Sequence, residues 1–336
     1  FYVFDAVCQQ LRAWRSELAG VCIAVNFSAI SFMAPEFVDR VQLTIEQHEV
    51  SPTQIKLEVT ETMLMTNADE VLQKMHALIA LGISFSIDDF GTGYSSLGYL
   101  KRFPFSELKI DRSFVTDVHL DPDSASLVRS MISIGHNLGI KVIAEGVENA
   151  QQLGFLRTAG CDELQGYYYS PPLPAQACLQ FLSQSADLML PTFLAEEQQR
   201  YLLLIDDEPG IIKALQRELR LESYETLTAS NSTEALTLLA TYPIDVVLTD
   251  LRLADMNGVE FLRKIRIIYP EVIRMVLSGS SEVTSILKAV NEGVIFRFIT
   301  KPWDADDLRG QLREAFKQRQ LLQENQRMRL QLLGGA

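Results

Sequence analysis

The chain has 336 residues, of which 47% are hydrophobic and 22% are charged, and its formal net charge is -13. This length and composition predict two globular domains rather than a disordered chain. The acidic balance excludes nucleic acid as a general partner, because there is no basic surplus to neutralise phosphates. No apolar stretch approaches the roughly 18 residues of a membrane span. The four cysteines are scattered and look like buried free thiols, so we expect a cytoplasmic protein.

The first half of the chain alternates predicted strands and helices. A helical period over residues 1–18 comes first. Six strands are then predicted, at 21–27, 54–59, 83–87 (leading to Asp88 and Asp89), 107–110, 140–144 and 163–164. Helices are predicted between and after them, at 35–48, 68–81, 97–101, 124–138 and 150–159, and a last helix is predicted after the break at Pro171-Pro172, ending at about 183. Strict alternation of this kind implies a parallel sheet with helical crossovers.

Polar residues stand at the carboxyl ends of successive predicted strands. These residues are Asn26, Glu58, Asp88, Asp89, Lys109, Glu145 and Gln165. In a (β/α)8 barrel, such strand ends form the rim on which active sites lie. Any one of these residues alone is better explained as a cap or a surface side chain. Six successive strands that each offer a polar group at one rim predict a functional site.

The pair Asp88 and Asp89 indicates the chemistry of that site. The pair ends an apolar run and is followed by Gly91 and Gly93, which open a permissive turn. Two adjacent carboxylates repel each other unless a cation or a shared proton intervenes. Carboxylate and amide oxygens are ligands of Mg²⁺ or Mn²⁺, and no histidine or cysteine joins them. The pattern predicts a pair of ions roughly 3.5–4 Å apart, as in two-metal phosphoester hydrolysis, with Lys109 beside the attacking water or the phosphate.

Several stretches within residues 1–182 resemble the EAL domain family of cyclic di-GMP phosphodiesterases. They are VNFS at 25–28, LEVTET at 57–62, DDFGTGYSSL at 88–97, LKID at 108–111, AEGVE at 144–148 and QGY at 165–167. The resemblance implies a barrel that hydrolyses cyclic di-GMP to linear pGpG with two Mg²⁺ or Mn²⁺ ions. It implies that Asn26, Glu58 and Asp88 bind one ion, and that Asp88 and Asp89 bind the other.

The same resemblance implies roles for five further residues. Lys109 would lie by the water that bridges the ions. Glu145 and Gln165 would lie near the metals or that water. Glu61 and Glu148 would be supporting residues, with Glu61 holding the loop that follows the aspartate pair.

One part of the family pattern is missing. The Glu-Ala-Leu signature, with its metal-binding glutamate, lies upstream of the Asn26 strand in the family. We also find six strands where a closed barrel needs eight. We therefore expect an N-terminally cut, incomplete barrel with unpaired sheet edges that is poorly active or inactive as it stands. The alternative is a catalytically dead barrel that acts as an effector by binding cyclic di-GMP or only a partner protein.

The second half of the chain follows a polar linker predicted at 186–200. Strands are predicted at 201–205, 224–229, 244–249, 272–277 and 296–299, and helices between them at 209–221, 232–240, 258–268 and 283–291. Five alternating units predict a doubly wound sheet of flavodoxin-like order with its site at the strand carboxyl ends. The predicted domains are 1–185, the linker 186–200, 201–320 and a helical extension at 321–336.

Functional side chains again collect at strand carboxyl ends. They are Asp206, Asp207, Asp250, Ser278 and Lys301. Three acids can bind one Mg²⁺, a hydroxyl can follow a phosphoryl oxygen, and a lysine can balance the added charge. Over residues 200–320 this pattern resembles the receiver domain of response regulators.

The receiver resemblance implies Asp250 as the phosphoacceptor and, with Asp206 and Asp207, as a Mg²⁺ ligand. It implies Ser278 and Phe298 as switch residues, together with Lys301, whose bond to Pro302 is usually cis. It also implies a cognate histidine kinase or phosphotransfer protein as partner.

A helix is predicted from Asp304 to about residue 333, longer than a receiver requires. Its apolar residues predict either a short coiled coil that joins two chains into a homodimer or a signalling helix, with a solvated tail as the alternative. Together the two halves predict a two-component response regulator whose receiver controls cyclic di-GMP hydrolysis. A phosphorylation-gated scaffold acting through the terminal helix is a further alternative.

Overall fold

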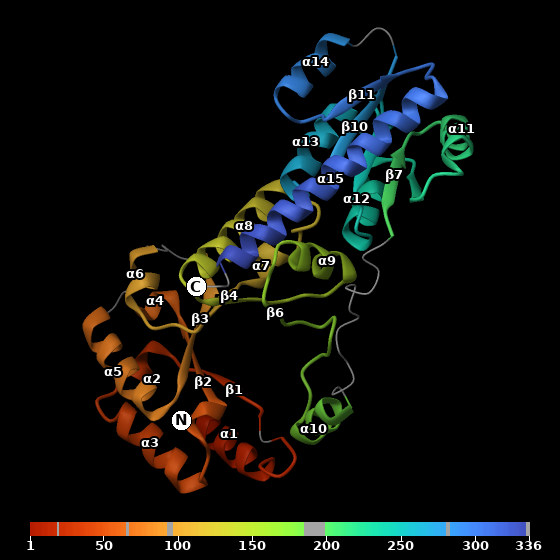
Figure 1. The fold of residues 1–336 in the computed structure, drawn as a ribbon. Coiled ribbons are helices and arrows are strands. Elements are labelled where there is room, and N and C mark those ends of the chain that lie inside the picture. Colours follow the sequence, from red (N-terminus) through yellow and green to blue (C-terminus); the bar gives the residue numbers. More distant parts are fainter. Residues whose placement is uncertain (19, 65–66, 93–96, 185–198, 280–282, 334–336) are drawn as a thin grey trace. The chain divides into compact units, whose positions relative to one another are not determined.

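The computed structural model describes every residue except 19, 65–66, 93–96, 185–198, 280–282 and 334–336. The chain divides into two compact units, and each contains one parallel β-sheet (Figure 1). Within the described residues, no helix is both long and apolar enough to cross a membrane.

The first unit contains a sheet of six strands, which neighbour one another in chain order and are all parallel. The strands are β1 (Ile23–Asn26), β2 (Ile55–Thr60), β3 (Ser84–Phe90), β4 (Glu107–Ile110), β5 (Lys141–Ala144) and β6 (Glu163–Leu164). The six predicted strands and their alternation with helices are therefore confirmed.

One helix precedes the first of these strands, and helices follow each of the six. They are α1 (Tyr2–Ala13), α2 (Ala29–Met33), α3 (Phe37–His48), α4 (Glu61–Leu64), α5 (Ala68–Leu81), α6 (Leu97–Arg102), α7 (Arg112–Val115), α8 (Pro122–Asn137), α9 (Ala150–Thr158) and α10 (Ala175–Gln184), with a 3₁₀ turn η1 (Pro52–Gln54). The helix predicted over 1–18 ends at Ala13. The short helices α2, α4 and α7 were not predicted, because four or five residues are too few to show a helical period.

The first sheet has one apolar and one polar face, as β2 shows. Its alternate residues point to opposite faces, so that Leu57 and Val59 lie on one face and Lys56 and Glu58 on the other. Both faces are buried at this point, since Leu57 and Val59 are 0% exposed and Glu58 is 6% exposed. Lys109 of β4 is buried as well. The sheet therefore holds charged side chains in an interior, where they must be paired.

Strand β3 is irregular at its carboxyl end. Its register with β4 shifts between Ile87 and Phe90, which is the mark of a β-bulge. Within the bulge Asp89 takes a left-handed backbone conformation with φ 53°, and Gly91 follows with φ 96°. A left-handed residue other than glycine is uncommon and is concentrated at functional sites. The bulge interrupts the alternation that would send Asp88 and Asp89 to opposite faces.

The second unit contains a five-stranded parallel sheet in the order β11-β10-β9-β7-β8. Its elements are β7 (Tyr201–Ile205), α11 (Pro209–Leu219), β8 (Glu225–Ala229), α12 (Ser232–Thr241), β9 (Val246–Asp250), α13 (Gly258–Ile268), β10 (Ile273–Ser278), α14 (Val283–Asn291), β11 (Arg297–Thr300) and α15 (Ala305–Leu333). This order, with its reversal between β7 and β9, confirms the doubly wound, flavodoxin-like prediction.

Helices α11 and α15 share one core cluster with the strands of the second sheet. In α15, Leu308, Leu312 and Phe316 are at most 4% exposed and recur at the spacing of one helix face. Tyr224 packs on the same cluster and stacks on Phe316 with ring centroids 4.6 Å apart. The long terminal helix is thus part of the receiver-like unit at its start, and it continues to Leu333 as predicted.

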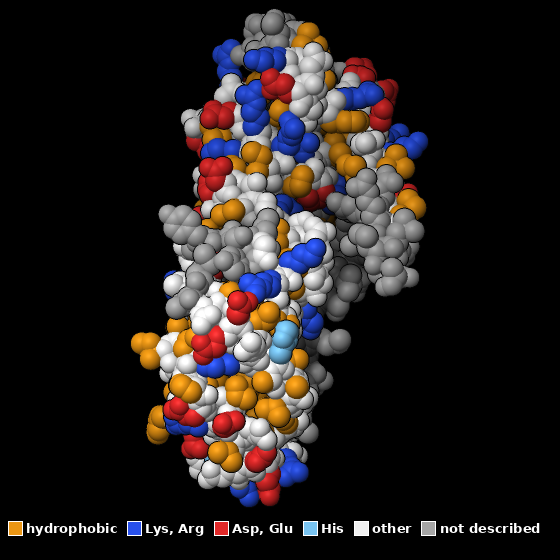
Figure 2. Space-filling model, turned by 90° about the vertical axis from the view of Figure 1, so that its left-hand side faces the viewer, with side chains coloured by type: hydrophobic (Ala, Val, Ile, Leu, Met, Phe, Trp, Pro, Cys, Tyr) orange, Lys and Arg blue, Asp and Glu red, His pale blue; other side chains and the backbone are white. Residues whose placement is uncertain are grey.

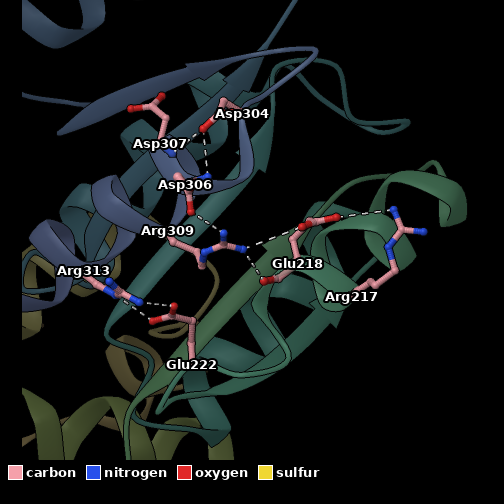
Figure 3. Close-up of polar contacts among 8 residues, drawn as sticks. All are labelled: Arg217, Glu218, Glu222, Asp304, Asp306, Asp307, Arg309 and Arg313. Carbon is pink, nitrogen blue, oxygen red and sulfur yellow. Dashed lines mark hydrogen bonds and ion pairs between the residues drawn. The ribbon is translucent and has the colours of Figure 1, made fainter.

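Ion pairs also join α15 to α11 and the turn after it (Figure 3). The Arg313 guanidinium pairs with Glu222 at 2.7 Å, and Arg309 lies 3.8 Å from Glu218. Arg309 also pairs with Asp306 at 2.6 Å within its own helix. On the face drawn in Figure 2, basic and acidic side chains are interspersed. Because the Arg313 side chain is 68% exposed and Arg309 and Glu218 are partly exposed, water screens these pairs and their individual contributions are modest. Burial of the apolar residues is therefore the main anchor of α15.

Candidate functional site

Lys109 lies at the centre of a set of acids in the first sheet. Its Nζ is 2.7 Å from Glu58, 2.5 Å from Glu145 and 3.3 Å from Asp88. The acids come from β2, from the residue after β5 and from β3. Since the strands are parallel, their carboxyl ends meet at one edge and bring together residues far apart in the chain.

The charge of Lys109 is fixed by these contacts. Burial lowers the pKa of the ammonium, but its hydrogen bonds with Glu145 and Glu58 outweigh that effect, and the pKa is raised above its usual value. The group is therefore protonated at neutral pH. It offsets part of the negative charge that the surrounding carboxylates accumulate.

Asp88, Asp89 and Glu145 form a carboxylate set that could hold a cation. One oxygen from each lies within 4.8 Å of the other two. The pKa values of Glu145 and Asp89 are both raised, mainly by burial and also by the neighbouring acids. Lys109 acts in the opposite direction on both but does not cancel the rise. Within the described residues the buried Asp88 Oδ1 accepts no hydrogen bond, although the Lys109 Nζ lies 3.3 Å from it. An all-oxygen set with a buried oxygen that is free of hydrogen bonds fits Mg²⁺ or Mn²⁺.

Asn26 and Glu58 stand beside this set. The Asn26 Nδ2 donates to the Glu58 carboxylate at 2.8 Å, and the other Glu58 oxygen contacts Lys109. Glu58 thus links the amide of β1 to the lysine of β4. In the described residues, Glu58 does not join the group of three carboxylates whose oxygens lie within 4.8 Å of one another.

The remaining predicted residues are placed differently. Gln165 is exposed, and its backbone is held by a bond from its N–H to Ala144 and one from Val147 to its carbonyl. Glu148 is exposed and pairs with Arg112 at 2.8 Å, rather than with the acids around Lys109.

Glu61 begins α4 and is 9% exposed. The loop that it was predicted to hold includes 93–96, which lie outside the described residues.

Lys56 and Glu107 were missed by sequence reasoning. They form an ion pair between β2 and β4, with side chains 17% and 8% exposed. Lys56 stands two residues before Glu58, and Glu107 stands two residues before Lys109. A charged residue at position i−2 of a buried strand faces the same way as the site residue, which is the signal that could have found them.

The second sheet also holds a lysine between acids. The Lys301 Nζ lies 2.9 Å from Asp206 and 2.8 Å from Asp250. Burial lowers the pKa of the Lys301 ammonium, but its hydrogen bonds with Asp250 and Asp206 raise that pKa by more than burial lowers it. The pKa of Lys301 is therefore above its usual value. The Asp206 Oδ1 accepts from the Glu208 N–H at 2.9 Å, and the Asp250 Oδ2 accepts from the Arg252 N–H at 3.1 Å.

Ser278 and Lys301 are joined through the backbone. The Lys301 N–H donates to the Ser278 carbonyl at 2.7 Å, and the Ser278 hydroxyl donates to the Gly279 carbonyl at 2.8 Å. The Lys301–Pro302 bond is cis, as the sequence predicted. Phe298 is half-buried on β11, in register with Val276.

Asp207 is exposed beside this arrangement. With Asp206 it lines a pocket of about 280 Å³ between α11 and the end of β8. In the described chain, Asp206, Asp207 and Asp250 do not come as close together as the three carboxylates of the first sheet. The Lys301 ammonium lies between Asp206 and Asp250.

Comparison with known proteins identifies both halves. The family model of the EAL domain matches residues 1–172, and that of the response regulator receiver domain matches residues 202–313. The chain therefore belongs to the EAL domain family and carries a receiver domain after it.

Two Pseudomonas aeruginosa proteins are among the similar relatives. The bifunctional diguanylate cyclase/cyclic di-GMP phosphodiesterase MucR is 45% identical over 179 residues, which are 53% of this chain and 26% of that protein. The cyclic di-GMP phosphodiesterase NbdA is 42% identical over 184 residues, 54% of this chain and 23% of that protein. The chain thus spans about a quarter of the length of these relatives.

A solved structure titled as a MucR phosphodiesterase in complex with c-di-GMP is also similar. It is 44% identical, with a TM-score of 0.51, and the match covers 53% of this chain and 72% of that one. The crystal structure of the EAL domain of Mycobacterium smegmatis DcpA is 29% identical with a TM-score of 0.53, over 55% of this chain and 83% of that one.

Proposed function

We propose that the EAL part of this chain hydrolyses cyclic di-GMP to linear pGpG with divalent metal ions, under control of the receiver. The observation that carries the proposal is the group of acids around Lys109, at the carboxyl edge of a sheet that belongs to the EAL family. The relatives named as cyclic di-GMP phosphodiesterases support this substrate.

Asp88, Asp89 and Glu145 would hold the metal, with Glu58 and Asn26 beside them. Bound ions would polarise the phosphate and supply an activated water as nucleophile. Hydrolysis would break one bond between phosphorus and a ribose oxygen and so open the ring, with water supplying the hydroxyl on phosphorus and the proton on the released ribose oxygen.

The chain's own residues prepare this step. Glu58 and Glu145 hold the Lys109 ammonium beside Asp88, where it can orient the attacking water and offset charge on the phosphate. Because Lys109 is only 5% exposed, bulk water screens its charge only weakly. In this proposal Gln165 lies at the same rim, and Glu61 and Glu148 act only as supports.

The receiver would be phosphorylated on Asp250, with Asp206, Asp207 and Asp250 as ligands of a Mg²⁺ ion. The Lys301 ammonium, which contacts Asp250 at 2.8 Å, and the Ser278 hydroxyl would then bind the phosphoryl group. These new contacts would shift the surface around Ser278 and Phe298 from one of two conformations to the other, and so change the rate of cyclic di-GMP hydrolysis. A histidine kinase or phosphotransfer protein is the expected phosphodonor, and a homodimer through α15 is part of the proposal.

The test is turnover of cyclic di-GMP with Mg²⁺ or Mn²⁺, on this chain and on a form extended at its amino end. We expect pGpG as product and loss of turnover in Glu58→Ala and Lys109→Ala. Binding of cyclic di-GMP without turnover, indifferent to the metal and to Lys109→Ala, would replace the proposal with an effector function.

A further inference from the structure

Two ion pairs lie one behind the other on the polar face of the first sheet. In one pair, Glu58 of β2 contacts Lys109 of β4, and in the other, Lys56 of β2 contacts Glu107 of β4. Each member of the second pair precedes its counterpart by two residues, so that both pairs project from the same face. Their polarity is opposite, because the acid stands on β2 in the first pair and on β4 in the second.

Both pairs span β3, and Ser86 lies between them. Ser86 is 0% exposed and is in register with Glu58 on one side and Glu107 on the other. Within the described residues, neither the Ser86 hydroxyl nor the Glu107 Oε2 has a hydrogen-bond partner. Because Ser86 and Glu107 are buried, water screens the charges beside them only weakly. Charges two residues apart on a strand are roughly 6–7 Å apart, and at that distance they interact strongly in such surroundings.

The order of these charges has a consequence for the site. The Lys56 ammonium stands behind the Glu58 carboxylate, and the Glu107 carboxylate stands behind the Lys109 ammonium. Glu58 and Lys109 each therefore have one opposite charge on the other strand and a second opposite charge two residues earlier on their own strand. Two attractions from different directions restrict a side chain more than one does.

We propose that Lys56 and Glu107 are positioning residues, which hold Glu58 and Lys109 in their working arrangement through the order of the four charges. The inference rests on the proposed function of Glu58 and Lys109. A pair that merely stabilised the fold would require only two opposite charges at these positions, in either order. A positioning pair requires the lysine on β2 and the glutamate on β4.

Two double variants separate these roles. Lys56→Glu with Glu107→Lys keeps an ion pair but reverses its order, so that like charges stand behind Glu58 and Lys109. Lys56→Met with Glu107→Leu removes both charges at similar volume, a change that folded proteins often tolerate. The control is Arg263→Met with Glu292→Leu, which removes an exposed ion pair of the second unit, 2.7 Å apart.

Two readouts apply to the full chain. The first is the dissociation constant of Mn²⁺, measured by electron paramagnetic resonance. The second is the ammonium signal of Lys109 in ¹⁵N NMR of the metal-free chain, assigned by its loss in Lys109→Arg. We expect the reversed variant to bind Mn²⁺ about tenfold more weakly or worse, as one misplaced charge predicts, and to shift the Lys109 signal. The neutral variant should have a Mn²⁺ dissociation constant between those of the reversed variant and the control. The control should match the unaltered chain.

A reversed variant with an unchanged Mn²⁺ constant and Lys109 signal would overturn the inference and leave a structural pair. If that variant does not fold, as judged by circular dichroism, the neutral variant decides in the same way. If neither the unaltered chain nor the form extended at its amino end binds Mn²⁺, the proposed metal-dependent function fails. The Lys109 signal of the metal-free variants still decides whether Lys56 and Glu107 position it.

Discussion

Both sheets place a lysine among carboxylates at the carboxyl ends of parallel strands, but they hold it differently. Lys109 belongs to β4, its side chain is 6% exposed, and it contacts three acids. Lys301 follows β11, its side chain is 21% exposed, and it contacts two. A residue inside a central strand has its backbone fixed by neighbours on both sides, whereas a residue in a loop does not.

This difference matches two kinds of work. A fixed ammonium suits catalysis, because a charge already in place needs no rearrangement when the transition state forms. A lysine on a loop suits a switch, since Lys301 can follow a new charge on Asp250 and move the Ser278 carbonyl to which its N–H is bonded. The comparison predicts that changes at Lys109 act on rate, and that changes around Lys301 act on modification and stability.

The largest effect is expected for Asp250→Asn. The amide cannot form an acyl phosphate, so that all labelling at this position by acetyl phosphate should be lost. The measurement is the mass gain of one phosphoryl group on the intact chain. Asp255→Asn is the control, because Asp255 accepts hydrogen bonds from Ser232 and lies outside the Lys301 contacts. Labelling that persists in Asp250→Asn would place the phosphoacceptor elsewhere.

In the form extended at its amino end, Lys109→Met should reduce cyclic di-GMP turnover by about 10²–10³-fold, the usual loss when one prearranged charged or donor group is removed. Turnover should be measured with Mn²⁺ at saturating substrate, so that the loss is assigned to the rate rather than to substrate binding. Lys141→Met, at the exposed start of β5, is the control and should retain full turnover. A drop of less than about threefold would mean that the buried lysine is structural.

A smaller effect, on stability, is expected for Lys301→Ala. Removal of the ammonium leaves Asp206, whose side chain is 1% exposed, and Asp250 without their shared cation. We expect a loss of about 1–3 kcal/mol in the free energy of unfolding, smaller than for a fully buried pair because Lys301 is partly exposed. Millimolar Mg²⁺ should restore part of it by occupying the acids. Urea unfolding with and without Mg²⁺ measures the loss of stability and its restoration. An unchanged urea midpoint in Lys301→Ala would contradict the expected loss.

Much of the fold could be predicted from the sequence because its signals are local. The alternation of apolar runs and helical periods gave all eleven strands, and α5 (Ala68–Leu81) has the predicted bounds. The strand ends also pointed to Asp88, Lys109 and Glu145, since parallel strands bring their carboxyl ends to one edge.

What could not be predicted depends on contacts between strands. The bulge that turns Asp88 and Asp89 out of alternation arises from a register shift between β3 and β4, and register is a property of two strands rather than one. The pairing of Glu148 with Arg112 depends in the same way on where α7 begins. No local pattern in the sequence states either.

The comparison of the two sheets extends to an acid at the opposite end of β9 from Asp250. Asp245 is 9% exposed; its Oδ2 accepts from the Tyr201 N–H at 3.0 Å, and its Oδ1 lies 3.5 Å from Arg319 of α15. Burial raises the pKa of Asp245, although the Tyr201 N–H, Arg319 and Arg200 oppose the shift. Like Glu145 and Asp89 beside Lys109, Asp245 is an acid for which burial makes ionisation in the folded state less favourable.

The smallest effect is therefore a pH dependence, measured in Asp245→Asn. Because the folded chain binds this proton more tightly than the unfolded chain, the stability from Asp245 is fully present below the usual carboxyl pKa and is lost as the pH rises through the raised pKa. The thermal midpoint of the unaltered chain, relative to the variant, should fall by a few degrees between about pH 4 and pH 7. Asp306→Asn, at a side chain 92% exposed, is the control. Parallel midpoint curves for Asp245→Asn and the unaltered chain would show that Arg319 and the Tyr201 amide fully offset burial, as the acids offset it at both lysines.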